Sequence, residues 1–304
     1  MTTGTKLRAL LATARIANVP SVLSNLGVGV LLGCAQDGTG FRWPWLLSLA
    51  AILFYVGGNF LNDWADRDVD KSRRPERALP RGMFMAKSYL TAALVCFGAG
   101  LSISCFYGWL VSLVAIVLVF LIVWYTEIHK KSAISVIPMG LCRACLPVLG
   151  YIGMRGSFAS PALFPAIALL IYIIALSLSA RSESRSDIPQ EKKWQARGLL
   201  SASGLIAAAL PLLLNPAVGL IGLIPFGLWL LLSLTIYRSP IQAHVSALLA
   251  GIPLVDWIIL LPMAWIWLRL QRVETTDGMF LTALLLPPLA FIAGRMLQRL
   301  APAT

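Results

Sequence analysis

The stretch YGWLVSLVAIVLVFLIVWY, residues 107–125, contains no charged side chain. About 20 apolar residues in a helix cross the hydrocarbon core of a bilayer, so this stretch predicts a membrane span. Nine further apolar stretches are separated by short polar segments: 16–34, 43–61, 89–105, 133–153, 160–180, 198–213, 216–236, 245–268 and 279–294. The 198–213 stretch is short, and Pro253 and Pro262 interrupt the ninth stretch. We therefore expect nine or ten spans, the alternative to ten being that one of the last four stretches is re-entrant or lies in the interface.

The composition also indicates a membrane protein. Of the 304 residues, 58% are apolar and 12% are charged, and the mean hydropathy is +0.80. A soluble chain carries roughly 25% charged residues, so this chain has too few to cover a soluble surface. The numbers exclude a soluble enzyme, a nucleic-acid-binding domain and a disordered scaffold. They predict one all-α integral-membrane domain over residues 1–304, with the lipid bilayer as its surroundings.

Basic residues lie in alternate loops. Of the 25 Lys and Arg residues, 18 fall on one side if the N-terminus is placed in the cytoplasm, and four fall on the other. This leaves out Arg143 within a span and Arg295 and Arg299 near the C-terminus. Because basic residues concentrate in cytoplasmic loops, we expect a cytoplasmic N-terminus in a bacterial inner membrane. The N-terminus has no signal-peptide cleavage pattern, so the first stretch is expected to remain as a span.

The second apolar stretch ends in NFLNDWADRDVD, residues 59–70. On a helix, five of its polar side chains share or flank one face: Asn59, Asn62, Asp63, Asp66 and Asp70. Stacked carboxylates repel each other, so a cation must neutralise them. Nearby Arg side chains at a solvated helix end would do so. Rows of oxygen ligands suit Mg²⁺ better, since this ion binds through one or two carboxylates and substrate phosphates.

A basic segment follows directly. Residues 71–82, KSRRPERALPRG, hold five cations and two prolines. Arginine binds phosphate oxygens in bidentate fashion, so the junction of acidic and basic segments predicts a phosphate-bearing ligand.

A second acidic cluster follows the sixth apolar stretch. Glu183, Asp187 and Glu191 are again spaced by four, although Pro189 limits the helix. Both clusters face the cytoplasm in the predicted orientation. They are typical of two halves of one diphosphate–metal site, although a salt-bridged surface loop would also explain the second cluster.

These motifs resemble a known family. Asn59-x-x-Asn62-Asp63-x-x-Asp66-x-x-x-Asp70, with Arg74-Pro75-Glu76-Arg77 and Leu79-Pro80-Arg81-Gly82, resembles the first signature of UbiA-type intramembrane prenyltransferases. Further similarities are Arg15 and Asn18 before the first span, Tyr125 with Lys130 and Lys131 after the fourth, and Glu183-x-x-x-Asp187 at the second motif.

The resemblance implies a helical bundle, typically of nine spans, in which Mg²⁺ binds an isoprenyl diphosphate and assists loss of pyrophosphate. A hydrophobic acceptor then attacks the allylic cation. The implied metal ligands are Asn62, Asp63, Asp66, Asp70, Glu183 and Asp187, of which Asp66, Asp70 and Asp187 are also expected to be catalytic. The implied substrate-binding residues are Asn18, Arg74, Arg77 and Lys130 or Lys131.

The second motif departs from the family pattern, which usually has aspartates there. In this chain the motif holds Glu183, Gln190 and Glu191 in addition to Asp187. The segments 139–143 and 177–183 resemble the divergent EboC proteins, which belong to bacterial gene clusters linked to precursor export or secondary metabolism. The alternatives are therefore a Mg²⁺-dependent prenyltransferase and a catalytically silent protein that binds or presents an isoprenoid or lipid-linked intermediate. The intact first motif favours catalysis.

Two charges lie at membrane depth, where ionisable residues mark functional sites. Arg143 either approaches the diphosphate or an acceptor carboxylate, or pairs with Asp256. Asp256 either forms that ion pair with Arg143 or binds the acceptor. His129 and His244 flank spans and are expected at the interface. We expect the cysteines to be small core residues, because they lie in or beside apolar stretches without a CxxC pair: Cys34, Cys96, Cys105, Cys142 and Cys145.

Overall fold

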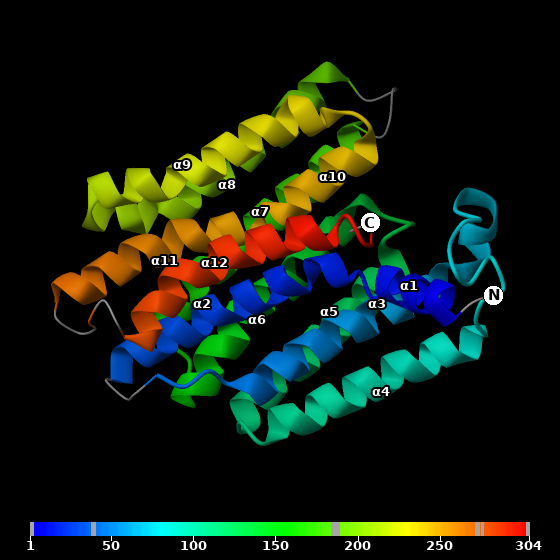
Figure 1. Cartoon of the computed structure of the whole chain (residues 1–304), viewed down its shortest axis with the longest axis horizontal. Coiled ribbons are helices and arrows are strands. Elements are labelled where there is room, and N and C mark those ends of the chain that lie inside the picture. Colours follow the sequence, from blue (N-terminus) through cyan, green and yellow to red (C-terminus); the bar gives the residue numbers. More distant parts are fainter. Residues whose placement is uncertain (1–2, 38–40, 184–188, 271–273, 275–276, 302–304) are drawn as a thin grey trace.

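The computed structural model describes residues 3–37, 41–183, 189–270, 274 and 277–301. Within these residues the regular structure is helical (Figure 1). The α-helices are α1 (Thr3–Thr13), α2 (Val19–Asp37), α3 (Trp45–Arg73), α4 (Ala86–Cys105), α5 (Trp109–Ile128), α6 (Val136–Arg155), α7 (Leu163–Glu183), α8 (Gln190–Leu214), α9 (Pro216–Leu234), α10 (Ile241–Ala250), α11 (Ile252–Arg269) and α12 (Gly278–Leu297). The short 3₁₀ helices are η1 (Ile16–Asn18), η2 (Ala133–Ser135), η3 (Ser160–Ala162) and η4 (Ile236–Arg238).

The prediction of an all-α membrane bundle is confirmed. In the described part of the chain, ten helical segments are long and apolar enough to cross a membrane, and they coincide with the ten predicted stretches. The interrupted ninth stretch forms α10 and α11, which together reach this length. The helix α1 before the first span was not predicted, because its 11 residues are shorter than a membrane span.

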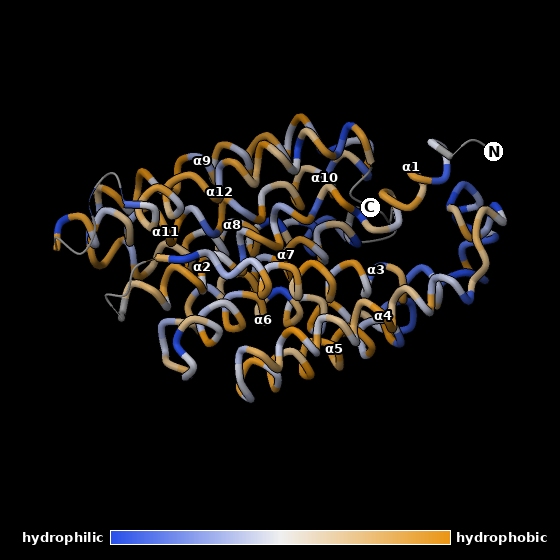
Figure 2. The backbone as a smooth tube through the Cα atoms, turned by 60° about the horizontal axis from the view of Figure 1, so that its bottom comes forward, coloured by the Kyte–Doolittle hydropathy of each residue, from blue (hydrophilic) through white to orange (hydrophobic). Residues whose placement is uncertain are grey.

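The helices lie side by side along the long axis of the bundle, and both termini are at the same end (Figure 1). Hydrophilic segments gather toward the two ends, whereas the middle is mostly hydrophobic (Figure 2). Helices α2, α10 and α11 have the most buried side chains, while α4, α9 and α12 lie at the periphery. The arrangement matches a bilayer, in which backbone polar groups must bond internally and apolar side chains face outward.

The interior helix α2 packs very closely against α6. A Cβ atom at Gly29 would overlap the backbone carbonyl of Pro147, and one at Gly150 would overlap the carbonyl of Leu26. Small residues allow helix backbones to approach each other in membranes. This contact fixes the two helices that carry polar groups to the centre of the bundle.

The break between α10 and α11 lies at Gly251, followed by Pro253 in the first turn of α11. A break frees carbonyl groups, which need partners at membrane depth. The Tyr172 hydroxyl donates to the carbonyl of Leu248 at 2.7 Å, and the Trp229 indole donates to that of Ala247 at 2.8 Å. Side chains of α7 and α9 therefore bond two of the carbonyl groups at the break.

Two predictions about single residues are wrong. Cys105 is exposed and not a core residue, because it ends the peripheral helix α4. His244 is buried, not interfacial, because α10 turns it into the bundle. There its ring lies 3.1 Å from the Ser179 hydroxyl and 3.0 Å from the carbonyl of Ser233.

The α2–α6 contact gives a test of the packing. Gly29→Ala should lower the free energy of unfolding by about 1–3 kcal/mol, because the added methyl group meets backbone that cannot move aside. Gly98→Ala is the matched control, since nothing lies within 4 Å of a Cβ there. Thermal unfolding in detergent checks both variants. Equal midpoints would contradict the close approach.

Candidate active site

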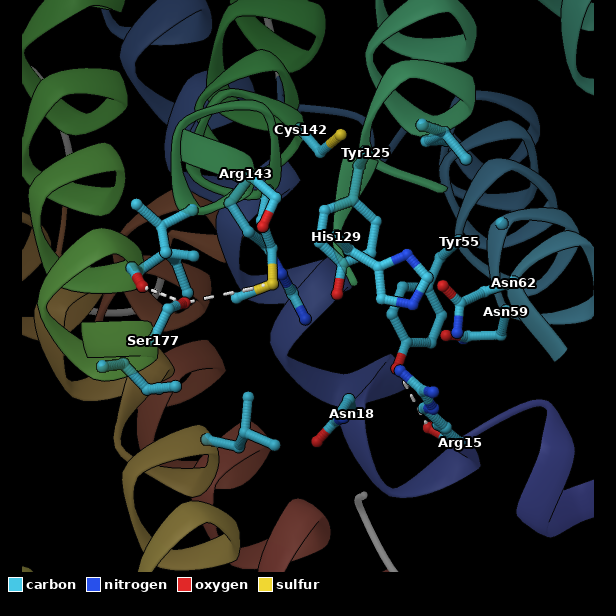
Figure 3. A pocket seen from close by; sticks show the side chains of 18 of the residues that line it. Arg15, Asn18, Tyr55, Asn59, Asn62, Tyr125, His129, Cys142, Arg143 and Ser177 are labelled. Atoms are coloured by element: carbon cyan, nitrogen blue, oxygen red, sulfur yellow. Dashed lines mark hydrogen bonds between the residues drawn. The ribbon is translucent and has the colours of Figure 1, made fainter. Parts of the chain in front are cut away.

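A cavity of about 600 Å³ lies within the bundle. Its wall is formed mainly by α3, α5, α6 and α7, with Arg15 and Asn18 beside them (Figure 3). Acidic and amide side chains of α3 and the arginines that follow it line one end. Phe54, which lies three turns or about 18 Å earlier on α3 than Asp66, marks the apolar part, together with Leu118 and Ile173.

The acidic face of α3 is buried and neutralised by cations. Asp63, Asp66 and Asp70 are each less than 9% exposed. The Arg77 guanidinium donates to Asp70 Oδ2 at 2.7 Å and to Asp63 Oδ1 at 3.1 Å. Buried carboxylates are strongly destabilising unless paired, so the segment after α3 must fold back over the helix that precedes it.

Lys130 bridges the other pair of carboxylate oxygens. Its Nζ lies 2.7 Å from Asp66 Oδ1 and 3.7 Å from Asp70 Oδ1. The ammonium group thus occupies a position between two carboxylates on one helix face. This contact joins α3 to the end of α5.

His129 lines the cavity directly after the last residue of α5, and its expected position at the membrane interface stays a prediction. Its Nε2 lies 3.1 Å from Asp66 Oδ2, and its Nδ1 lies 2.9 Å from the carbonyl of Thr126. The ring therefore bridges the backbone at the end of α5 and the acidic face of α3. Tyr125, one turn earlier, stacks on the ring with centroids 5.1 Å apart. The spacing of four between Tyr125 and His129 is the sequence signal that could have revealed this pair.

Arg15 reaches the acidic face from the segment between α1 and η1. Its backbone adopts the left-handed region (φ 47°, ψ 50°), which costs an L-residue about 1–2 kcal/mol. The Tyr55 hydroxyl donates to the Arg15 carbonyl at 3.3 Å, and the Asn59 amide donates to the carbonyl of Ala14 at 3.1 Å. These bonds hold the strained turn so that the guanidinium lies 3.9 Å from Asp63.

The donor set fits a hard divalent cation. Asn62 Oδ1 is buried and has no hydrogen-bond partner in the described structure. Asp66 and Asp70 follow it at intervals of four, and both line the cavity. No group of three His, Cys, Asp or Glu side chains in the described ranges is arranged to hold a metal. Mg²⁺ needs only one or two carboxylates when a substrate phosphate supplies further oxygens, so the two observations agree.

The second acidic motif is only partly described. Helix α7 ends at Glu183, whose side chain lies outside the described part, and Asp187 lies outside the described residues altogether. The preceding residues Ala180 and Arg181 line the cavity, and Arg181 donates to the Ser135 hydroxyl at 2.7 Å. The end of α7 therefore reaches the same cavity as the first motif.

The predicted substrate-binding residues separate into two groups. Asn18, Arg74, Arg77 and Lys130 line the cavity. Lys131 does not: its side chain is 76% exposed and lies 3.9 Å from Glu127 on the outside of α5. Successive residues at the end of α5 point in different directions, and only Lys130 turns toward α3.

Arg143 and Asp256 do not pair directly. The Arg143 guanidinium donates to the Ser21 hydroxyl and to Asn25 Oδ1, each at 3.1 Å. The Asn25 amide donates in turn to Asp256 Oδ2 at 2.8 Å, and the Ser24 hydroxyl donates to the same oxygen. Asn25 thus links a cation on α6 to a fully buried carboxylate on α11.

Comparisons with known proteins agree with this geometry. The profile described as the UbiA prenyltransferase family matches residues 26–238. This chain belongs to the UbiA prenyltransferase family. The matched region includes the first acidic motif, the basic segment after it and the end of α7. Membership in the EboC-like subgroup stays a prediction.

Among UbiA-family relatives, the digeranylgeranylglyceryl phosphate synthase of Thermococcus gammatolerans is 25% identical over 81% of this chain and 96% of its own length. Matches to several other such synthases span less than half of those proteins. A solved digeranylgeranylglyceryl phosphate synthase has a similar fold, with a TM-score of 0.61 and 17% identity over 85% of this chain and 97% of that chain. A UbiA homologue from Archaeoglobus fulgidus bound to DMAPP and Mg²⁺ gives a TM-score of 0.52 and 12% identity, covering 94% of this chain and 98% of its own.

The buried network behind the cavity makes a stability prediction. Asn25→Ala removes the acceptor for Arg143 and a donor to Asp256, so it should lower the free energy of unfolding by about 2–4 kcal/mol. Ser21→Ala, which removes one neutral partner of Arg143, should cost about 1 kcal/mol. Thermal unfolding of the two variants in detergent measures the difference. A smaller effect at Asn25 would mean that the link carries no net stabilisation.

Proposed function

We propose that this protein catalyses Mg²⁺-dependent transfer of an isoprenyl group from an isoprenyl diphosphate to a hydrophobic acceptor. The observation that carries the proposal is the buried acidic face of α3 at one end of an apolar cavity. Lys130 and Arg77 form ion pairs with its carboxylates. A diphosphate at that end leaves its isoprenyl chain beside apolar walls. The relatives and the Archaeoglobus fulgidus homologue bound to DMAPP and Mg²⁺ support the same chemistry.

The chain's own residues would act on the leaving group. The oxygens that would hold Mg²⁺ come from Asn62, Asp66 and Asp70, with Asp63 beside them. In the second acidic motif, the proposed metal ligands are Glu183 and Asp187. When bound, the metal neutralises charge on the diphosphate. Arg74, Arg77 and Lys130 bind the diphosphate oxygens and stabilise the negative charge that develops as the carbon–oxygen bond breaks.

The apolar part of the cavity would protect the reaction. Loss of pyrophosphate leaves an allylic cation, which reacts with water wherever water is present. Phe54, Leu118 and Ile173 exclude water around the isoprenyl chain. The faces of Tyr55 and Tyr125 carry negative potential and suit a nearby cation. The acceptor then forms the new carbon bond and releases a proton.

Arg143 would bind the acceptor. It stacks over Tyr55, with Cζ 5.5 Å from the ring centroid, and Tyr55 lies about three turns from Asp66 along α3. A fixed cation this deep repels the allylic cation unless an anion accompanies it. We therefore infer an acceptor with an anionic group. The acidic end would face the cytoplasm, as the distribution of basic residues predicts.

The proposed activity has a direct test in purified protein. With geranylgeranyl or farnesyl diphosphate, release of pyrophosphate should require Mg²⁺. Asp66→Asn should reduce the rate about 100-fold or more, as expected when an electrostatic contact to a developing charge is lost. Asp68→Asn is the matched control, because Asp68 is exposed and contacts Lys71 on another face of the same helix. Equal rates in the two variants would exclude this site.

The alternative is a catalytically silent protein that binds or presents an isoprenoid or lipid-linked intermediate. The altered second motif favours it, since Glu183 stands where the family usually has aspartate. Mg²⁺-dependent binding of the diphosphate without any release of pyrophosphate, with or without candidate acceptors, would support this alternative.

Binding of the diphosphate can be tested separately from turnover. Lys130→Gln should weaken binding of geranylgeranyl diphosphate about tenfold, the value of one charge-assisted hydrogen bond. Lys131→Gln should leave it unchanged, because that side chain points out of the bundle. Arg143→Gln should also leave it nearly unchanged if Arg143 meets the acceptor. Equilibrium binding in detergent gives all three values, and a loss at Arg143 would place this residue with the diphosphate.

A further inference from the structure

A second cavity, of about 920 Å³, lies at the same end of the bundle as the acidic residues. It is formed by the last turns of α12, by α10 and by the segment that follows α3. Arg73 and Arg74 line both this cavity and the candidate active site. Arg295 near the end of α12 and Arg299, two residues after that helix, line only the second cavity.

This cavity carries excess positive charge. Four arginines and one glutamate, Glu76, line it. Among the described residues, no carboxylate lies within 4 Å of any of the four guanidinium groups as an ion-pair partner. Elsewhere at this end, Arg77 and Lys130 are paired with buried acids. The cavity is therefore suited to an anion that the described part of the chain does not supply.

Arg295 is held in a defined position. Its guanidinium lies 5.1 Å from the ring of Trp229 and 5.0 Å from that of Tyr237. It also donates to Gln298 Oε1 at 2.7 Å, and the Gln298 amide donates to the carbonyl of Ser246 at 2.8 Å. Two rings and a bonded amide thus fix this cation on the cavity wall, unlike a freely moving surface arginine.

An exposed apolar stripe leads to these arginines. Leu285, Leu289, Ile292 and Met296 are 46–62% exposed and recur every three or four residues on one face of α12. Ile292 and Met296 also line the cavity. In a bilayer this peripheral stripe contacts acyl chains, so a molecule with a chain on the stripe presents its head to the arginines.

We propose that this cavity binds the phosphate headgroup of an anionic phospholipid, with Arg295 and Arg299 on the phosphate and an acyl chain along the stripe of α12. A free inorganic phosphate would use the arginines but not Ile292 and Met296. A lipid uses both. This site does not depend on the proposed catalytic function, although a lipid seated there lies against Arg73 and Arg74 at the edge of the active-site cavity.

The test uses the purified full-length protein in detergent and native mass spectrometry to count bound phosphatidylglycerol. The double variant Arg295→Gln/Arg299→Gln should weaken binding roughly 25-fold, since each basic residue near an anionic headgroup contributes a factor of about five. The control Lys87→Gln/Lys192→Gln removes two exposed charges outside the cavity and should leave binding unchanged. Phosphatidylcholine, which has no net charge, should bind far more weakly to the unaltered protein.

Three results would overturn the proposal. Equal losses in the two double variants would mean general attraction to a basic surface. Similar binding of both lipids would exclude an anion site. In a third case, inorganic phosphate or farnesyl diphosphate would displace phosphatidylglycerol from the unaltered protein. If this displacement disappears in Arg295→Gln/Arg299→Gln but not in the control, the cavity binds a soluble phosphate compound. If the double variant does not fold, Arg299→Gln serves instead, because the described structure gives its side chain no partner, and a fivefold loss is then expected.

Discussion

Three carboxylates buried on one face of α3 require neutralisation, and much of the structure around the cavity provides it. Asp63, Asp66 and Asp70 cannot remain charged in a low-dielectric bundle without cations nearby. Arg77, Lys130 and Arg15 supply these charges from three different segments. The pairing therefore fixes the chain before α2, the end of α5 and the segment after α3 around one point.

The same pairing prepares the site for its proposed ligand. Each cation that neutralises a carboxylate also lines the cavity and carries donors that suit phosphate oxygens. A site built from acids alone would repel a diphosphate, and one built from bases alone would repel a divalent metal. Alternating acids and bases let the metal and the diphosphate bind together, because each shields the other from like charges.

A second polar network, formed by Arg143, Asn25 and Asp256, lies deeper in the bundle and holds a buried cation in place. Arg143 is a cation in the apolar bundle, and it contacts the neutral groups of Ser21 and Asn25 and the ring of Tyr55. Asp256 lies behind Asn25, whose amide bonds to both side chains. This leaves the guanidinium fixed but able to accept an anionic partner in the cavity. Close packing of α2 on α6 at Gly29 and Gly150 fixes Asn25 relative to Arg143.

The sequence by itself determined the helical class, the ten apolar stretches and the first acidic motif. Each of these depends on residues that are close together in the sequence. The evidence is the length of the apolar stretches, the four-residue spacing of Asn62, Asp66 and Asp70, and the basic segment that follows directly. It could not determine which cation meets which acid. Lys130 and Lys131 are equivalent in sequence, but the rotation at the end of α5 sends only Lys130 to Asp66. His244 looked interfacial because it flanks an apolar stretch, yet neighbouring helices enclose it. Those choices depend on how distant helices pack, and only the tertiary structure fixes that.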